Sequence, residues 1–159
     1  MSPVLTAQTS RTVITAAVKT RLESLAGLNV FVSEVPNLPP GIPGRAGRAG
    51  RMAPYAAIFP SAGALDPNPN LAATPCDFTW GAQINFAAGL PADLESTLDA
   101  AIPLLNLWSP VIEGLDVGKL RPPAGFYGGQ GHAATRRDDK FTPPRYWVPT
   151  LWRLHVTTA

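Results

Sequence analysis

Residues 78–88 read FTWGAQINFAA, and their side chains alternate between two kinds. The first kind is apolar and falls on every second position: Phe78, Trp80, Ala82, Ile84, Phe86 and Ala88. The residues between them include Thr79, Gly81, Gln83 and Asn85. Because successive side chains of a strand point to opposite faces, this period of two predicts a β-strand with one face on a core. A sheet around this strand is therefore the expected centre of the fold.

Three other stretches predict strands of the same sheet. The runs at 28–35 and 55–59, LNVFVSEV and YAAIF, are rich in β-branched and aromatic residues. In the run at 146–156, one face carries Tyr146, Val148, Trp152, Leu154 and Val156. Pro149 in this run has no N–H to donate, which predicts an edge position or a bulge. A further short strand near residues 117–120 is an open alternative.

Two stretches predict amphipathic helices. The first covers residues 12–26, followed by Gly27 at a position that favours a left-handed helix end. Its apolar stripe consists of Ile14, Ala17, Val18, Leu22 and Leu25. Pro91 opens the second helix, whose stripe consists of Leu94, Leu98, Ala101, Ile102 and Leu105. Pro103 lies inside this pattern and is expected to kink the helix or to end its first segment.

These elements predict an α+β fold in one domain spanning residues 1–159. Consecutive strands without helices between them indicate an antiparallel sheet, and two amphipathic helices can cover one of its faces. The expected architecture has two layers: a mainly antiparallel four-stranded sheet with two helices packed on one face. Two long Pro/Gly-rich loops are expected at 36–54 and 121–144, and the second is expected to be mobile.

The composition narrows the class of protein. Charged residues make up 15% of the chain, against about 25% in typical domains, so some apolar surface is expected to lie against other subunits. The formal net charge of +2 does not by itself indicate nucleic-acid binding. No run of apolar residues is long enough to cross a membrane. The N-terminus lacks the pattern of a signal peptide, and the single cysteine allows no intrachain disulfide.

The chain shows no pattern typical of an enzyme, a cofactor site or a metal site. Cys76 has no nucleophile signature around it, and a lone cysteine is usually a small apolar filler. His132 and His155 do not have the spacing of zinc ligands. Asp138 and Asp139 could together bind a hard cation, but a solvated turn is the favoured interpretation. The stretch GFYGGQG at 125–131 lacks the strand and helix of a dinucleotide fingerprint. We therefore expect no catalytic residues and no cofactor.

Residues 41–51 read GIPGRAGRAGR and place an arginine at every third position, Arg45, Arg48 and Arg51. The run is too short for a collagen-like triple helix. As a nucleic-acid motif, one copy offers only three flexible guanidinium groups, which is a weak footprint. An ordinary solvated loop remains the third interpretation. Several copies brought together by a ring would add their charges around one axis.

Three stretches and the order of the elements resemble a known family. The stretches are PYAAIFPSAG at 54–63, DFTWGAQINFAAG at 77–89 followed by a Pro-Ala-Asp-Leu helix, and RRDDKFTPPRYWVPTLWRLHV at 136–156. Together they cover somewhat less than a third of the chain. They are similar to the tail terminator proteins of long-tailed, siphovirus-type bacteriophages, and most similar to forms from phages of actinobacteria.

This resemblance implies a structural virion protein rather than an enzyme. The expected assembly is a homo-hexameric ring at the head-proximal end of the tail tube, formed in the host cytoplasm and retained in the virion. The ring would stop polymerisation of the tube and present a surface to the head–tail connector. Its expected partners are itself, the tail tube protein, the connector protein and the genomic DNA that passes through the lumen, with no membrane.

Two groups of residues are expected to make contacts in such a ring. Arg45, Arg48 and Arg51 would meet DNA phosphates in the lumen, or acidic faces of the neighbouring ring. The block RRDD, residues 136–139, would pair reciprocally with an adjacent subunit: Arg136, Arg137, Asp138 and Asp139. A locally paired, solvated turn is the alternative for this block.

Two other functions remain open on the sequence. A head-completion or neck protein on the portal side would also act through a ring. A small DNA-binding module using the Gly/Arg segment would instead bind DNA as a monomer, with an affinity that depends on salt.

Overall fold

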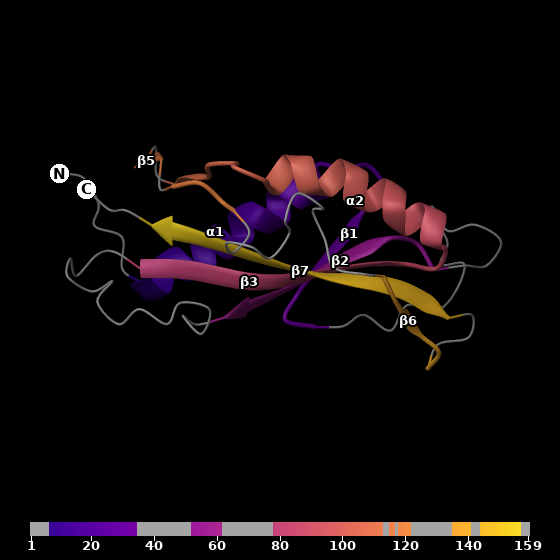
Figure 1. Ribbon diagram of the computed structural model, residues 1–159. Helices are drawn as coiled ribbons and strands as arrows, with labels where there is room; N and C mark the ends of the chain where they lie inside the picture. The colour runs from indigo at the N-terminus through magenta and orange to yellow at the C-terminus, as the bar shows by residue number, and fades with distance from the viewer. Residues whose placement is uncertain are drawn as a thin grey trace.

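The computed structural model is organised around strand β3, Phe78–Ala88, at the centre of a five-stranded sheet (Figure 1). The strand order is β1-β2-β3-β7-β6. The other strands are β1 (Asn29–Val32), β2 (Tyr55–Ser61), β6 (Arg136–Asp138) and β7 (Arg145–Val156). A separate two-stranded hairpin consists of β4 (Val111–Ile112) and β5 (Leu115–Asp116). The structure describes residues 7–34, 52–61, 78–112, 115–116, 118–121, 135–140 and 144–156.

The α+β class with a mostly antiparallel sheet is as predicted, but two details of the sheet are not. The four-strand prediction is wrong, because β6 is a fifth strand within a segment predicted to be a loop. Its sequence, Arg-Arg-Asp, shows no apolar alternation, so pairing with β7 defines it. The pair β1–β2 is parallel, not antiparallel. Residues 33–54 connect these strands and exceed the dozen residues that a parallel connection needs. Most of 36–54 and 121–144 lies outside the described residues.

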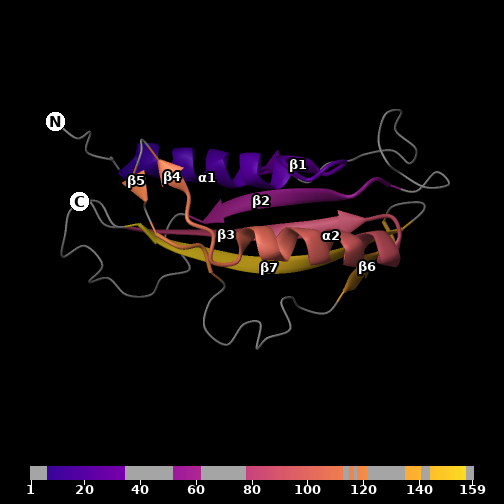
Figure 2. The same cartoon turned by 90° about the horizontal axis from the view of Figure 1, so that it is seen from above.

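Two helices, α1 (Ala7–Glu23) and α2 (Pro91–Leu105), cover one face of the sheet (Figure 2). Helix α1 packs against β1 and β2, and α2 packs against β3 and β7. Arg21 of α1 joins the two helices, because its Nε donates to the carbonyl of Leu104 at 3.2 Å. The Arg21 guanidinium also lies 5.2 Å from the ring centroid of Trp108. A cation at the carbonyl end of α2 is favoured by the helix dipole.

The helix boundaries differ from those predicted. Helix α1 begins and ends earlier than the predicted range 12–26. Gly27 has a φ of 79°, the left-handed conformation expected there. Helix α2 continues through Pro103 to Leu105, so Pro103 does not end it. Residues 118–120 form no strand, although Arg121 makes an isolated bridge with Arg153. None of the helices in the described part of the chain has both the length and the apolar character needed to cross a membrane.

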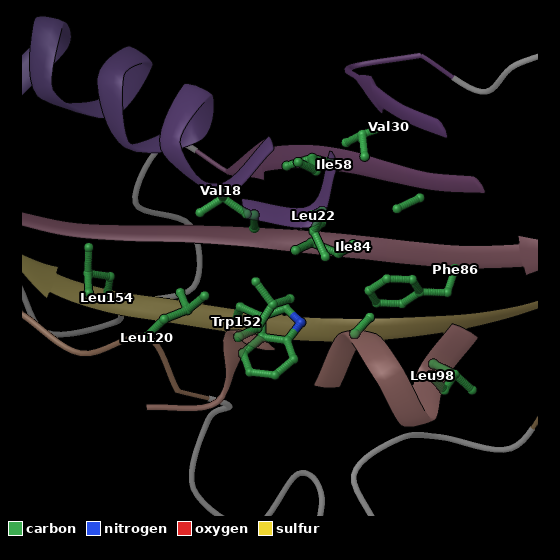
Figure 3. Close-up of a cluster of buried hydrophobic side chains, with 14 of the residues drawn as sticks. Val18, Leu22, Val30, Ile58, Ile84, Phe86, Leu98, Leu120, Trp152 and Leu154 are labelled. Carbon is green, nitrogen blue, oxygen red and sulfur yellow. The ribbon is translucent and has the colours of Figure 1, made fainter. Parts of the chain in front are cut away.

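The main core lies between the helices and the sheet (Figure 3). Each predicted stripe supplies its centre: Ile14, Val18 and Leu22 from α1; Leu94, Leu98, Ala101 and Leu105 from α2; and Trp80, Ala82, Ile84, Phe86 and Ala88 from β3. Two indoles in this core bond to threonine hydroxyls. Trp80 Nε1 donates to Thr15 Oγ1 at 3.0 Å, and Trp152 Nε1 donates to Thr150 Oγ1 at 2.8 Å.

The opposite face of the sheet has no helix over it among the described residues. It carries a second, smaller cluster of buried residues: Met52, Tyr55, Ala57 and Ala87. The partly buried Phe31, Phe59 and Trp147 pack against this cluster. The residues of β3 predicted to lie off the core therefore belong to a second face that is itself partly apolar.

Two strand prolines direct their nitrogens toward positions where a neighbouring strand has ended. The N–H of Ser33 donates to the carbonyl of Ile58 at 2.8 Å, so this carbonyl points toward β1. Pro60 lies two residues after Ile58, so its nitrogen also points toward β1. It lies beyond Ile58, which is the last residue of β2 that pairs with β1. In β7, Arg153 exchanges two backbone hydrogen bonds with Arg121 on the side away from β3. Pro149 lies four residues before Arg153, so its nitrogen also points away from β3. Strand β6 lies on that side of β7 but pairs only with residues 145–147. The edge position predicted for Pro149 is therefore present locally.

Candidate interaction surface

In the described part of the chain, several charged side chains come together where β6 pairs with the start of β7. The register places Arg136 opposite Trp147, Arg137 opposite Tyr146 and Asp138 opposite Arg145. Side chains alternate between the faces of a strand, so Arg136 and Asp138 share one face and Arg137 lies on the other. The predicted block RRDD thus begins as an edge strand.

Three arginines in this region lie over aromatic rings. The guanidinium carbon of Arg136 lies 5.1 Å from the ring centroid of Trp147, and that of Arg137 lies 5.9 Å from Tyr146. The guanidinium of Arg145 lies 6.0 Å from the ring of Tyr55 on β2. A cation over an aromatic face is attracted by the negative face of the ring. We call these residues, with Asp138 and Asp139, the arginine–aromatic edge.

Arg145 connects three strands of this edge. Its Nη2 donates to Asp138 Oδ2 of β6 at 3.0 Å, and its Nη1 donates to the Tyr55 hydroxyl of β2. The side chains of Arg145 and Asp138 are only 11% and 19% exposed. This ion pair is therefore largely shielded from water and joins β6 to β7, and loss of one partner would leave the other charge partly buried.

Local hydrogen bonds and burial shift the pKa of two groups here. The backbone N–H of Lys140 donates to Asp138 Oδ1 at 3.0 Å. This hydrogen bond, assisted by the Arg145 guanidinium, holds the pKa of Asp138 below its usual value. Burial raises the pKa of Tyr55 above its usual value despite the opposing effect of Arg145. Asp138 is therefore charged and Tyr55 neutral near pH 7.

The second acidic residue of the block has an exposed partner. Arg137 Nε donates to Asp139 Oδ1 at 2.6 Å, with 58% and 73% of the two side chains exposed. The Asp139 carboxylate raises the pKa of Arg137. All four residues of RRDD thus have a partner within the chain, although three of them lie in strand β6 rather than in a solvated turn. Pairing with an adjacent subunit stays a prediction.

A shallow pocket of about 210 Å³ lies beside Arg145, lined also by Tyr55, Ala57, Asn85, Asp138 and Trp147. Ligand pockets are usually larger, at about 300–1,000 Å³. Because the charges of Arg145 and Asp138 already satisfy one another, the pocket offers no uncompensated charge to a ligand. The arginine–aromatic edge therefore suits contact with another surface better than binding of a small molecule.

The other predicted candidates are not brought to this edge. Arg45, Arg48, Arg51, Cys76 and His132 lie outside the described residues. His155 lies opposite Thr79 in the β3–β7 pairing. Among the described residues, no group of three His, Cys, Asp or Glu side chains could hold a metal ion. The oxygens of Asp138 and Asp139 bond instead to Lys140, Arg145 and Arg137.

Sequence reasoning missed the parts played by Arg145, Tyr55 and Trp147. Arg145 and Trp147 directly flank Tyr146, where the predicted strand begins. The aromatic residues Tyr146 and Trp147 follow soon after Arg136 and Arg137 in the sequence. This closeness could have indicated cation–π contacts. Tyr55 gave no such signal, because only the pairing of β2, β3 and β7 brings it to Arg145.

Protein-family models and curated proteins were both compared with this chain, and neither comparison gave a match.

Proposed function

We propose that this chain is a structural subunit of a long-tailed bacteriophage, which forms a closed ring at the head-proximal end of the tail tube. In this role it ends the tube, presents a surface to the head–tail connector and catalyses no reaction. The ring is homo-hexameric, as the resemblance to tail terminator proteins implies.

The supporting observation is that the three resembling stretches form one continuous block of the fold. They supply β2, β3 with the start of α2, and β6 with β7. These strands are neighbours in the order β2-β3-β7-β6, although the stretches are separated along the chain.

The arginine–aromatic edge supplies a surface suited to such a subunit. It lies at one margin of the sheet, and its Arg136 and Arg137 side chains are exposed. In this proposal the Gly/Arg segment, with Arg45, Arg48 and Arg51, faces the lumen or the neighbouring ring. DNA phosphates or acidic protein surfaces are its partners there.

The test is the mass of the purified chain in solution, alone and with tail-tube subunits, followed by imaging of mature particles with labelled chain. We expect a closed oligomer that stops growth of tubes in vitro and a label only where the tail tube meets the head. A label on the portal side of the connector would favour the head-completion alternative. A monomer that binds duplex DNA with a steep salt dependence, and leaves tube growth unchanged, would contradict the ring.

A further inference from the structure

The outer side of α1 carries a shallow apolar pocket with basic residues beside it. The pocket has a volume of about 370 Å³ and lies between α1 and the ends of β1 and β2. Its apolar part includes Ala16, Val32 and Pro60, and its charged part is Arg11 and Lys19. These five residues form the basic flank, which contains no acidic residue.

The outer side of α2 carries only acidic charge. Glu95 and Asp99 are exposed and four residues apart, so they are neighbours on one side of the helix. Helix α2 contains no basic residue, and no ion pair at Glu95 or Asp99 is found within the described ranges. Like charges at this spacing destabilise a helix slightly. We call these two residues the acidic flank.

The two flanks face in opposite directions. Helix α1 lies over the β1–β2 side of the sheet and α2 lies over the β3–β7 side, as Figure 2 shows. In α2, Ser96 and Ala100 line a pocket shared with residues 25–28 after α1, so they face α1. With 3.6 residues per turn, Glu95 and Asp99 then face away from α1. In α1, the basic flank borders β1 and β2 rather than α2.

We propose that the basic flank of one copy docks against the acidic flank of the next copy. Opposite charges on opposite sides of one chain permit a head-to-tail contact, which repeats from copy to copy and closes as a ring. A two-fold contact would instead bring each flank against itself and oppose like charges. The pocket between α1 and the strand ends is then covered by α2 of the neighbouring copy. This inference rests on the proposed ring and names the contact that builds it.

The test uses charge reversal on each flank, read out as oligomer mass by native mass spectrometry and sedimentation. Lys19→Glu and Asp99→Lys should each raise the dissociation constant of the assembly roughly tenfold or more, since each opposes like charges at every contact. The double variant with both changes should restore assembly. Lys119→Glu is the matched control for Lys19→Glu, because it makes the same change at an exposed position outside both flanks. This control should assemble like the wild type.

Mixing the two single variants gives the sharper result. The reversed flank of the Lys19→Glu chain is complementary to the reversed flank of the Asp99→Lys chain, and the unchanged flanks of the two chains meet at the next contact. The mixture should therefore form only rings with an even number of subunits and alternating composition. Wild-type rings whose mass is unchanged by both single reversals would overturn this contact and leave the ring itself standing. A wild-type chain that stays monomeric with tube subunits present would overturn both.

Discussion

At the scale of single residues, the core depends on two threonines that satisfy buried indoles. Thr150 is fully buried; its hydroxyl accepts from Trp152 Nε1 and donates to the carbonyl of Ile84 at 2.7 Å. Thr15 accepts from Trp80 in the same way and donates to the carbonyl of Arg11 at 2.9 Å. A buried donor without a partner costs more than its hydrogen bond contributes when formed. These threonines therefore allow two large aromatic side chains to lie inside the fold.

Thr150→Val should lower the free energy of unfolding by about 1–3 kcal/mol, because it keeps the shape of the side chain and removes the buried hydroxyl that accepts from Trp152 Nε1 and donates to the Ile84 carbonyl. Urea denaturation followed by tryptophan fluorescence measures this loss. Thr97→Val is the matched control, since the Thr97 hydroxyl donates to the Asp93 carbonyl of its own helix and, among the described residues, accepts from no indole. We expect the control to change stability by less than about 0.5 kcal/mol. Equal losses from the two substitutions would show that the buried indole is not the cause.

At the scale of elements, long periodic segments were predictable and short ones were not. Strand β3 has the bounds that its alternation predicts, because one face is packed along its length. Helix α2 follows its apolar stripe in the same way. Strand β6 carries no such pattern, since its place depends on β7 and on Arg145 rather than on its own residues. The parallel direction of the β1–β2 pair could not be predicted either. Nothing in the sequence of the connecting residues indicates in which direction the chain returns.

Pro103 provides a prediction at this scale. It lies within α2 with an exposed side chain, and proline has no N–H for the helical hydrogen bond at that position. Pro103→Ala should therefore raise the free energy of unfolding by roughly 1 kcal/mol or more, with little packing lost. Pro91→Ala is the control, since Pro91 begins the helix, where no N–H is needed. Thermal unfolding would contradict the prediction if Pro103→Ala melted at or below the wild-type temperature.

At the scale of the whole molecule, the junction of β2, β6 and β7 contributes to how stability changes with pH. The pKa of Asp138 is lowered in the folded chain. Its contribution is therefore complete above the unfolded value of about 4 and is lost as the pH falls through the folded pKa. The pKa of Tyr55 is raised by burial. Its contribution is complete below the unfolded value of about 10 and is lost as the pH rises through the folded pKa.

We therefore expect stability to decrease below about pH 4 and above about pH 10. Asp138→Asn should lower stability near pH 7 and make the acid decrease shallower, while Tyr55→Phe should make the alkaline decrease shallower. Urea midpoints measured across this pH range test both effects. Asp139→Asn serves as the control on the acid side, because its ion pair with Arg137 is exposed and is weakened by the surrounding water. An acid limb equally steep in Asp138→Asn and in the wild type would contradict the role of this junction.

The placement of Pro60 and Pro149 also bears on how such a chain behaves when crowded. A bare sheet margin with a full row of N–H donors is a template on which further chains can add as extra strands, leading to ribbons and aggregates. Here the two edge strands, β1 and β6, have four residues or fewer. Just past the end of each, a proline of the neighbouring strand, Pro60 or Pro149, leaves no N–H donor. At high local concentration, addition of further copies through backbone pairing is therefore disfavoured. Contacts between copies are then made by side chains.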